Sequence, residues 1–130
     1  MIELRSMMLL AAGLLAGCEG ERAAPDAKQA AAPVTIRNDF HERMLTLDEL
    51  QRGAALRRAI RASKERCDRV EAAAFQQDHE NLKMWVARCQ AVAYAVFLAA
   101  DGGVQVRKCD DVQSLGLPKC DETAVAAKAQ

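Results

Sequence analysis

Cysteine is the residue type in this chain with the widest range of possible chemistry. The 130-residue sequence contains five: Cys18, Cys67, Cys89, Cys109 and Cys120. A cysteine can bind a metal, act as a nucleophile, carry a lipid or form a disulfide. No two of the five lie in a Cys-x-x-Cys spacing, so the zinc-knuckle and thioredoxin patterns are absent and we expect no metal site. The odd number indicates that one cysteine serves a different purpose from the other four.

The first cysteine follows a segment that is typical of an export signal. Arg5 gives a weakly positive start, and residues 7–16 are an apolar run that contains a single glycine, Gly13. A run of about ten residues is half of what a membrane-spanning helix needs, but it suits the apolar part of a secretory signal. We therefore expect residues 1–17 to be a signal peptide and the mature chain to fold in an oxidising compartment.

The signal ends in Leu15-Ala16-Gly17-Cys18, which resembles the bacterial lipobox. The resemblance implies a diacylglyceryl group on the Cys18 thiol, cleavage after Gly17 and acylation of the new amino terminus. Glu19 follows, where an Asp would favour inner-membrane retention in enteric bacteria. The resemblance thus implies a lipid anchor in the cell envelope, with the periplasmic side of the outer membrane as the expected location. An ordinary cleaved signal, with Cys18 left as a thiol, is the alternative.

Two disulfides are the expected state of the four remaining cysteines. Three pairings are possible, and we favour Cys67–Cys89 together with Cys109–Cys120. Cys67 lies between the predicted helix and the first strand, and Cys89 ends the neighbouring strand. Cys109 and Cys120 flank a short predicted turn, so their loop is easy to close. Closing such loops stabilises the fold by roughly 3 kcal/mol each on the chain-entropy estimate.

Other residues with catalytic potential are scarce. His41 is expected at the end of a tether and His79 in a turn, both solvated. Ser63 and Ser114 lie in no nucleophile motif. The sequence also contains no glycine-rich phosphate loop, so it predicts neither a catalytic residue nor a cofactor, and we expect no enzymatic activity.

Binding residues are sought among the aromatic and basic side chains. Trp85 and Tyr94, with Phe97, are candidates for an aromatic patch, although two of the three are expected in the core. Arg57 and Arg61 belong to a basic run that docks on an acidic partner or on anionic lipid heads if it is more than a solvated helix face. The whole chain balances 18 Lys and Arg against 18 Asp and Glu, which argues against a nucleic-acid partner.

The element pattern predicts an α+β domain over residues 44–120. A capping box at Thr46 begins one long helix over 47–65. Alternating apolar residues then predict three or four antiparallel strands, over 70–76 (where a helix is the alternative), 82–89, 92–99 and 104–107. A short helical turn over 110–115 follows, and the helix is expected to pack across one face of the sheet as a second layer. Residues 18–43 are predicted to be a flexible tether and 121–130 a disordered tail.

The predicted domain also resembles small exported proteins and lipoproteins of alphaproteobacteria to which no activity is assigned. The resemblance covers most of residues 40–120, and it depends on these segments: residues 56–60 before Cys67, then 84–89, 94–96, 101–106 and 117–120. These motifs are structural, so the resemblance implies no cofactor and no catalytic residue.

Together these features predict a non-enzymatic, membrane-anchored periplasmic lipoprotein with a binding or structural role in the cell envelope. Its partners would be the membrane, through the lipid on Cys18, and another envelope component. The alternative is an inhibitor of a secreted hydrolase such as a lysozyme or a protease. That function needs a protruding loop with an anchor residue, and residues 76–81 and 101–103 are the candidate loops.

Overall fold

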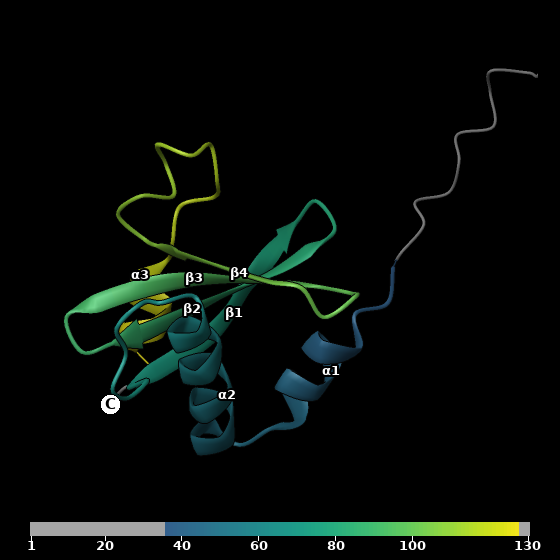
Figure 1. Cartoon of the computed structure of the whole chain (residues 1–130), viewed down its shortest axis with the longest axis horizontal. Coiled ribbons are helices and arrows are strands. Elements are labelled where there is room, and N and C mark those ends of the chain that lie inside the picture. The colour runs from purple at the N-terminus through teal and green to yellow at the C-terminus, as the bar shows by residue number, and fades with distance from the viewer. Residues whose placement is uncertain (1–35, 128–130) are drawn as a thin grey trace, which may run out of the picture. The chain divides into compact units, whose positions relative to one another are not determined.

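A four-stranded antiparallel sheet is the centre of the fold in the computed structural model, which describes residues 36–127 (Figure 1). The strands are β1 (Ala72–His79), β2 (Leu82–Cys89), β3 (Val92–Ala99) and β4 (Val104–Lys108), paired in chain order. The α+β class and the antiparallel sheet are confirmed. The strand predicted over 70–76 begins two residues later and continues to His79. The predicted signal peptide and Cys18 lie outside the described residues.

Short turns join consecutive strands. Glu80 begins the β1–β2 turn and Gln90 begins the β2–β3 turn, with φ angles of 53° and 55°. Gly102 lies in the β3–β4 connection with a φ of 90°. A positive φ at the first central residue belongs to type II′ hairpin turns, where glycine is preferred. Two of these turns therefore hold a residue with a side chain in a backbone conformation that is costly for it.

Two helices, α1 (Asp39–Thr46) and α2 (Glu49–Ala62), pack on one face of the sheet (Figure 1). The single long helix predicted over 47–65 was wrong. Asp48 is the cap of α2, and its side chain accepts a hydrogen bond from the Gln51 amide at 2.8 Å. Thr46, the predicted cap, is the last residue of α1, and its hydroxyl donates to the Arg43 carbonyl oxygen. A carboxylate at an N-cap also complements the helix dipole, so α2 begins after Asp48.

Helix α1 extends the folded unit towards the N-terminus. Its cap is Asn38, which accepts from the His41 amide and donates to the Leu98 carbonyl oxygen of β3, both at 2.9 Å. Asn38 is 3% exposed, so this cap fastens α1 to the sheet from within. Residues 39–43, predicted as the end of the tether, are therefore helical. The part of the predicted tether up to residue 35 lies outside the described residues.

The larger core lies between the two helices and the sheet. Helices contribute a few large side chains, and the central strands contribute most of the remainder. Its fully buried members include Leu56, Ile60, Trp85, Tyr94 and Val96. The Cys67–Cys89 disulfide borders this core and ties the segment after α2 to the end of β2.

A second core lies on the opposite face of the sheet. Val112 and Val125 are 0% and 2% exposed, and they pack with Met84, Val86 and Phe97 of the central strands. Residues 109–127 therefore form a third layer, and the expected two-layer arrangement was wrong. The short helical turn predicted over 110–115 is a run of hydrogen-bonded turns, and the C-terminal helix is α3 (Glu122–Ala126).

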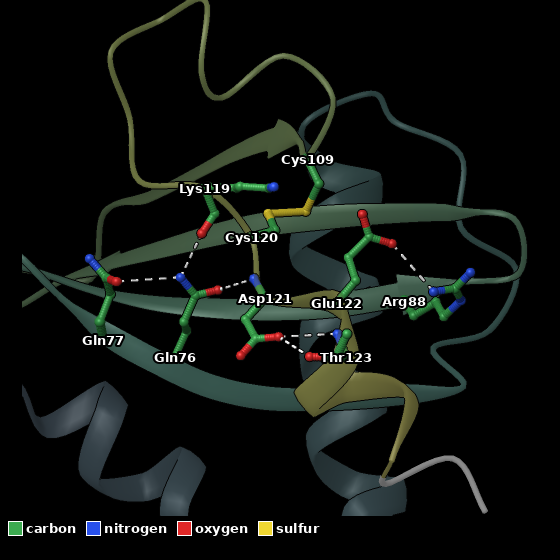
Figure 2. The surroundings of a disulfide bond; sticks show 9 residues. All are labelled: Gln76, Gln77, Arg88, Cys109, Lys119, Cys120, Asp121, Glu122 and Thr123. Carbon is green, nitrogen blue, oxygen red and sulfur yellow. Dashed lines mark hydrogen bonds and ion pairs between the residues drawn. A yellow bond between two sulfur atoms is a disulfide. The ribbon is translucent and has the colours of Figure 1, made fainter.

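The C-terminal layer is held to the sheet by a disulfide and a bridging amide (Figure 2). Cys109 and Cys120 are bonded, with their Cα atoms 5.6 Å apart. The Gln76 side chain of β1 donates to the Lys119 carbonyl oxygen at 2.8 Å and accepts from the Asp121 amide at 2.7 Å. Residues 121–127, expected to be disordered, are thus ordered as far as the structure describes them. Both disulfides join the pairs that the sequence argument favoured.

Candidate functional site

Helix α2 has one face towards the sheet and another towards solvent. Gly53, Leu56 and Ile60 are buried and recur at intervals of three or four residues. An ideal helix turns by about 100° per residue, which puts five exposed residues within an arc of roughly 100°. We call this set the α2 stripe, and its members are Leu50, Ala54, Arg57, Arg58 and Arg61. The helix thus presents three guanidinium groups to solvent beside a leucine that is 83% exposed.

The α2 stripe encloses a shallow hollow of about 350 Å³. Its lining is Ala54, Arg57, Arg58 and Arg61. The methyl group of Ala54 leaves space one helical turn before Arg57 and Arg58, so the three longer side chains surround an opening. A second groove, of about 280 Å³, runs between α2 and residues 68–70. It contains both acidic and basic side chains, and its lining residues are Glu49, Leu50, Gly53, Ala54, Arg57, Asp68, Arg69 and Val70.

The arginines of the α2 stripe have no carboxylate within ion-pair distance among the described residues. The four ion pairs of residues 36–127 involve other cations: Arg37, Lys83, Arg88 and Lys108. Asp110 and Asp111, in the loop that follows β4, are exposed on the other side of the sheet. Exposed carboxylates also lie near α2, at Asp48, Glu49 and Asp68, but none of them lines the hollow between the stripe arginines, and this absence favours an anionic partner there.

The aromatic candidates for binding do not reach the surface: two of the three were expected in the core, and all three lie there. Trp85, Tyr94 and Phe97 are 2%, 1% and 1% exposed. The Tyr94 hydroxyl donates to the Arg66 carbonyl oxygen at 2.9 Å, and burial raises the Tyr94 pKa. Trp85 and Tyr94 face the core beneath α1 and α2, whereas Phe97 faces the core beneath residues 109–127.

His41 was expected to be solvated, and the structure places it in the core. It is 7% exposed, and its Nδ1 accepts a hydrogen bond from the Trp85 indole nitrogen at 3.2 Å. The ring centroids of His41 and Phe75 are 4.5 Å apart, and the Arg52 guanidinium lies 5.6 Å from the Trp85 ring centroid. Burial, and then the charge of Lys83, lower the His41 pKa. This histidine therefore acts as a neutral acceptor that holds α1 on the sheet.

The other polar groups with catalytic potential have local structural partners. The hydroxyls of Ser63 and Ser114 donate to backbone carbonyl oxygens three or four residues earlier. Asp121 caps α3, and the Thr123 hydroxyl that donates to it is the main cause of its lowered pKa. Within residues 36–127 no group of three or more His, Cys, Asp and Glu residues is arranged to hold a metal ion. None of the helices described is long and apolar enough to cross a membrane.

The loop closed by Cys109 and Cys120, which the cysteine spacing predicted, protrudes from the domain (Figure 2). It carries Leu115, which is 54% exposed. The turn over 101–103, predicted as a possible anchor loop, is partly covered, because a Cβ atom on Gly102 would lie 2.8 Å from the Phe40 ring. The ten-residue spacing between the two cysteines was the available signal for the loop.

Sequence reasoning found the charge of the α2 stripe but not its shape. Arg57 and Arg61 were predicted as binding residues, and the structure brings both to one exposed face with Arg58. Ala54 and Leu50 were missed because alanine carries no functional group and an isolated leucine is normally read as core. The chain matches no protein-family model, no curated protein and no solved structure.

Proposed function

We propose that this protein is a non-enzymatic lipoprotein of the cell envelope, anchored through Cys18 and facing the periplasm from the outer membrane. Its small α+β domain binds another envelope component through the α2 stripe. The lipobox resemblance of Leu15-Ala16-Gly17-Cys18 supports the anchor. The two disulfides support folding in an oxidising compartment.

The observation that carries the binding role is the α2 stripe itself. Three arginines at the surface of one helix repel each other, and neighbouring carboxylates usually offset such repulsion. No such carboxylate pairs with Arg57, Arg58 or Arg61 among the described residues. An anionic partner would supply the missing counter-charge, and a hollow of about 350 Å³ is available to receive it.

The structural roles of the titratable and nucleophilic groups support a non-enzymatic function. His41 holds α1 on the sheet as an acceptor for Trp85, and Asp121 caps α3. Four of the five cysteines are oxidised in pairs. Each of these groups would lose its structural role if it took part in proton or group transfer.

Intact mass of the membrane-extracted protein tests the anchor. We expect a mature chain that begins at Cys18 and carries the mass of its acyl chains, and a Cys18→Ala variant that is absent from the membrane fraction. An unmodified Cys18 would overturn the lipoprotein assignment. Crosslinking in intact envelopes tests the binding role: the Arg57→Gln/Arg58→Gln/Arg61→Gln variant should lose the crosslinked species that the native protein forms.

The loop over 109–120 favours one other candidate, an inhibitor of a secreted hydrolase. A disulfide closes the loop at its base, and Leu115 is 54% exposed, so the loop offers a rigid support with an apolar anchor. Under this hypothesis an excess of the mature protein lowers lysozyme or protease activity, and Leu115→Asp restores it. Unchanged activity of both enzymes with the native protein would remove the candidate.

A further inference from the structure

We propose that the α2 stripe binds the anionic headgroups of the membrane that anchors the protein, so that α2 lies along the lipid surface. This inference rests on the proposed function, because the lipid anchor is what keeps the domain close to that membrane. The ligand of the α2 stripe is then the phosphate group of a lipid and not an acidic protein.

The geometry of the stripe suits a flat anionic surface. The five residues extend from position 50 to position 61, which is about 17 Å of helix at 1.5 Å per residue. They lie within one arc of the helix, so all of them can meet a plane at the same time. A flat partner that contacts the five residues of the stripe needs no deep pocket, and the hollow at Ala54 is shallow.

The chemistry of the side chains suits phosphate. A guanidinium group presents a planar set of donors that matches two phosphate oxygens, and it is weakly hydrated for a cation. Arg57, Arg58 and Arg61 surround the hollow without an acidic residue in its lining. Leu50, which is 83% exposed, lies at the N-terminal end of the same line and can enter the apolar edge of the headgroup region.

The charge distribution favours one orientation of the domain. The exposed carboxylates of Asp110 and Asp111 are in the layer on the far side of the sheet from α2. Glu49 and Asp68 border the groove beside α2, but the hollow itself has only Ala54 and the three arginines. An anionic surface therefore attracts the part of α2 that carries the three arginines and repels Asp110 and Asp111.

The length of chain before the domain limits how far it can move from the membrane. Seventeen residues lie between Cys18 and Ile36, the first described residue. Even fully extended, such a segment spans at most about 65 Å. The anchor therefore gives the domain a high effective concentration at the lipid surface, so a weak interaction is enough to keep α2 docked.

Vesicle binding tests the docking separately from the anchor. The mature chain with Cys18→Ser is mixed with phosphatidylcholine vesicles that contain about 30% phosphatidylglycerol, or with pure phosphatidylcholine vesicles, and sedimented. We expect binding to the anionic vesicles alone, lost at about 1 M NaCl, where charges are screened within about 3 Å. Each basic residue near such a surface contributes about fivefold in partitioning, so Arg57→Gln/Arg58→Gln/Arg61→Gln should bind roughly a hundredfold more weakly.

Two variants make the result specific to the stripe. Arg43→Gln/Arg107→Gln/Lys119→Gln removes the same charge from exposed positions on α1, β4 and the C-terminal loop, and it should bind almost as the native chain does. Ala54→Glu fills the hollow with a carboxylate at helical spacing from Arg57 and Arg58, and it should abolish binding while the fold is kept.

The possible outcomes separate this inference from the proposed function. Equal losses in the two triple variants would overturn it, because net charge would then explain the binding. Absence of vesicle binding, together with an acylated Cys18 in the intact-mass measurement, would overturn the lipid as partner and leave the anchored protein in place. Unmodified Cys18 with intact vesicle binding would overturn the anchor and leave the headgroup site.

Discussion

The stability of this domain is expected to fall below neutral pH because of His41. The imidazole is 7% exposed, and its Nδ1 must be unprotonated to accept the hydrogen bond from Trp85. Burial and the charge of Lys83 lower the His41 pKa, while Glu42 and Asp78 act weakly in the other direction. Protonation would place a charge in the core and leave the indole N–H without its acceptor.

The sign and the size of the effect follow from proton linkage. The unfolded state has the ordinary histidine pKa, about 6.5, and the folded state a lower one, so the unfolded state binds more protons between the two values. The free energy of unfolding is therefore constant well above pH 6.5 and decreases as the pH falls below it. One proton gives a slope of at most about 1.36 kcal/mol per pH unit, so the loss at about pH 5.5 is at most about 1.4 kcal/mol. The decrease ends below the folded-state pKa.

Urea unfolding followed by tryptophan fluorescence measures this directly, since Trp85 is the single tryptophan of the chain. His41→Asn provides the test, because an amide oxygen can accept from the indole near the place of Nδ1 but does not titrate in this range. We expect its free energy of unfolding to be nearly flat between about pH 7.5 and 5.0, and a His79→Gln control to keep the native slope. A decrease in His41→Asn as steep as in the native chain would refute the assignment to His41.

Three further stability changes are expected, each measured by urea unfolding at neutral pH. Gln90→Gly should raise the free energy of unfolding by about 0.5–1 kcal/mol, because it relieves a φ of 55° in the β2–β3 turn; no gain would mean that the turn is unstrained. Cys109→Ser with Cys120→Ser should lower it by roughly 3 kcal/mol and expose residues 109–127 to proteolysis; an unchanged value would show that Val112 and Val125 hold the layer alone. Gly102→Ala should lower the free energy of unfolding by about 2 kcal/mol, because alanine is strained at a φ of 90° and its Cβ would clash with the Phe40 ring. Adding Phe40→Ala to this variant should remove the clash but not the cost of the backbone conformation.

The sheet was predictable because its signals are local. Apolar residues alternate along 82–89 and form a nearly continuous run along 92–99, and turn residues flank both segments. The observed β2 and β3 have these same bounds. The helices were harder. Helix α1 buries only His41 and Met44, which is too few for a clear helical period, and its cap at Asn38 acts partly through a bond to a strand 60 residues away. The position of α1 thus depends on a contact that no local pattern contains, whereas α2 begins at a local cap, Asp48.

The third layer could not be predicted from periodicity. Val112 and Val125 are 13 residues apart in a segment with few apolar residues, and what joins them to the sheet is a disulfide and the Gln76 side chain. Of the three aromatic residues, only Phe97 lies under this layer, whereas Trp85 and Tyr94 lie under α1 and α2. Alternation shows that two faces of a sheet exist but not which face is covered. The basic side of the candidate site was predictable from helical spacing, whereas the hollow at Ala54 depends on how the three arginine side chains are placed around the small alanine.

The polar contacts that hold the layers together leave the α2 stripe without a structural role. Arg52 fastens the start of α2 by donating to the Met44 and Leu47 carbonyl oxygens at 3.0 and 2.6 Å, while Arg88 pairs with Glu122 of α3 at 3.3 Å. The stripe arginines point away from both cores, so glutamine in their place should change the free energy of unfolding by no more than about 0.5 kcal/mol. A loss of binding in that triple variant is therefore attributable to the surface and not to the fold.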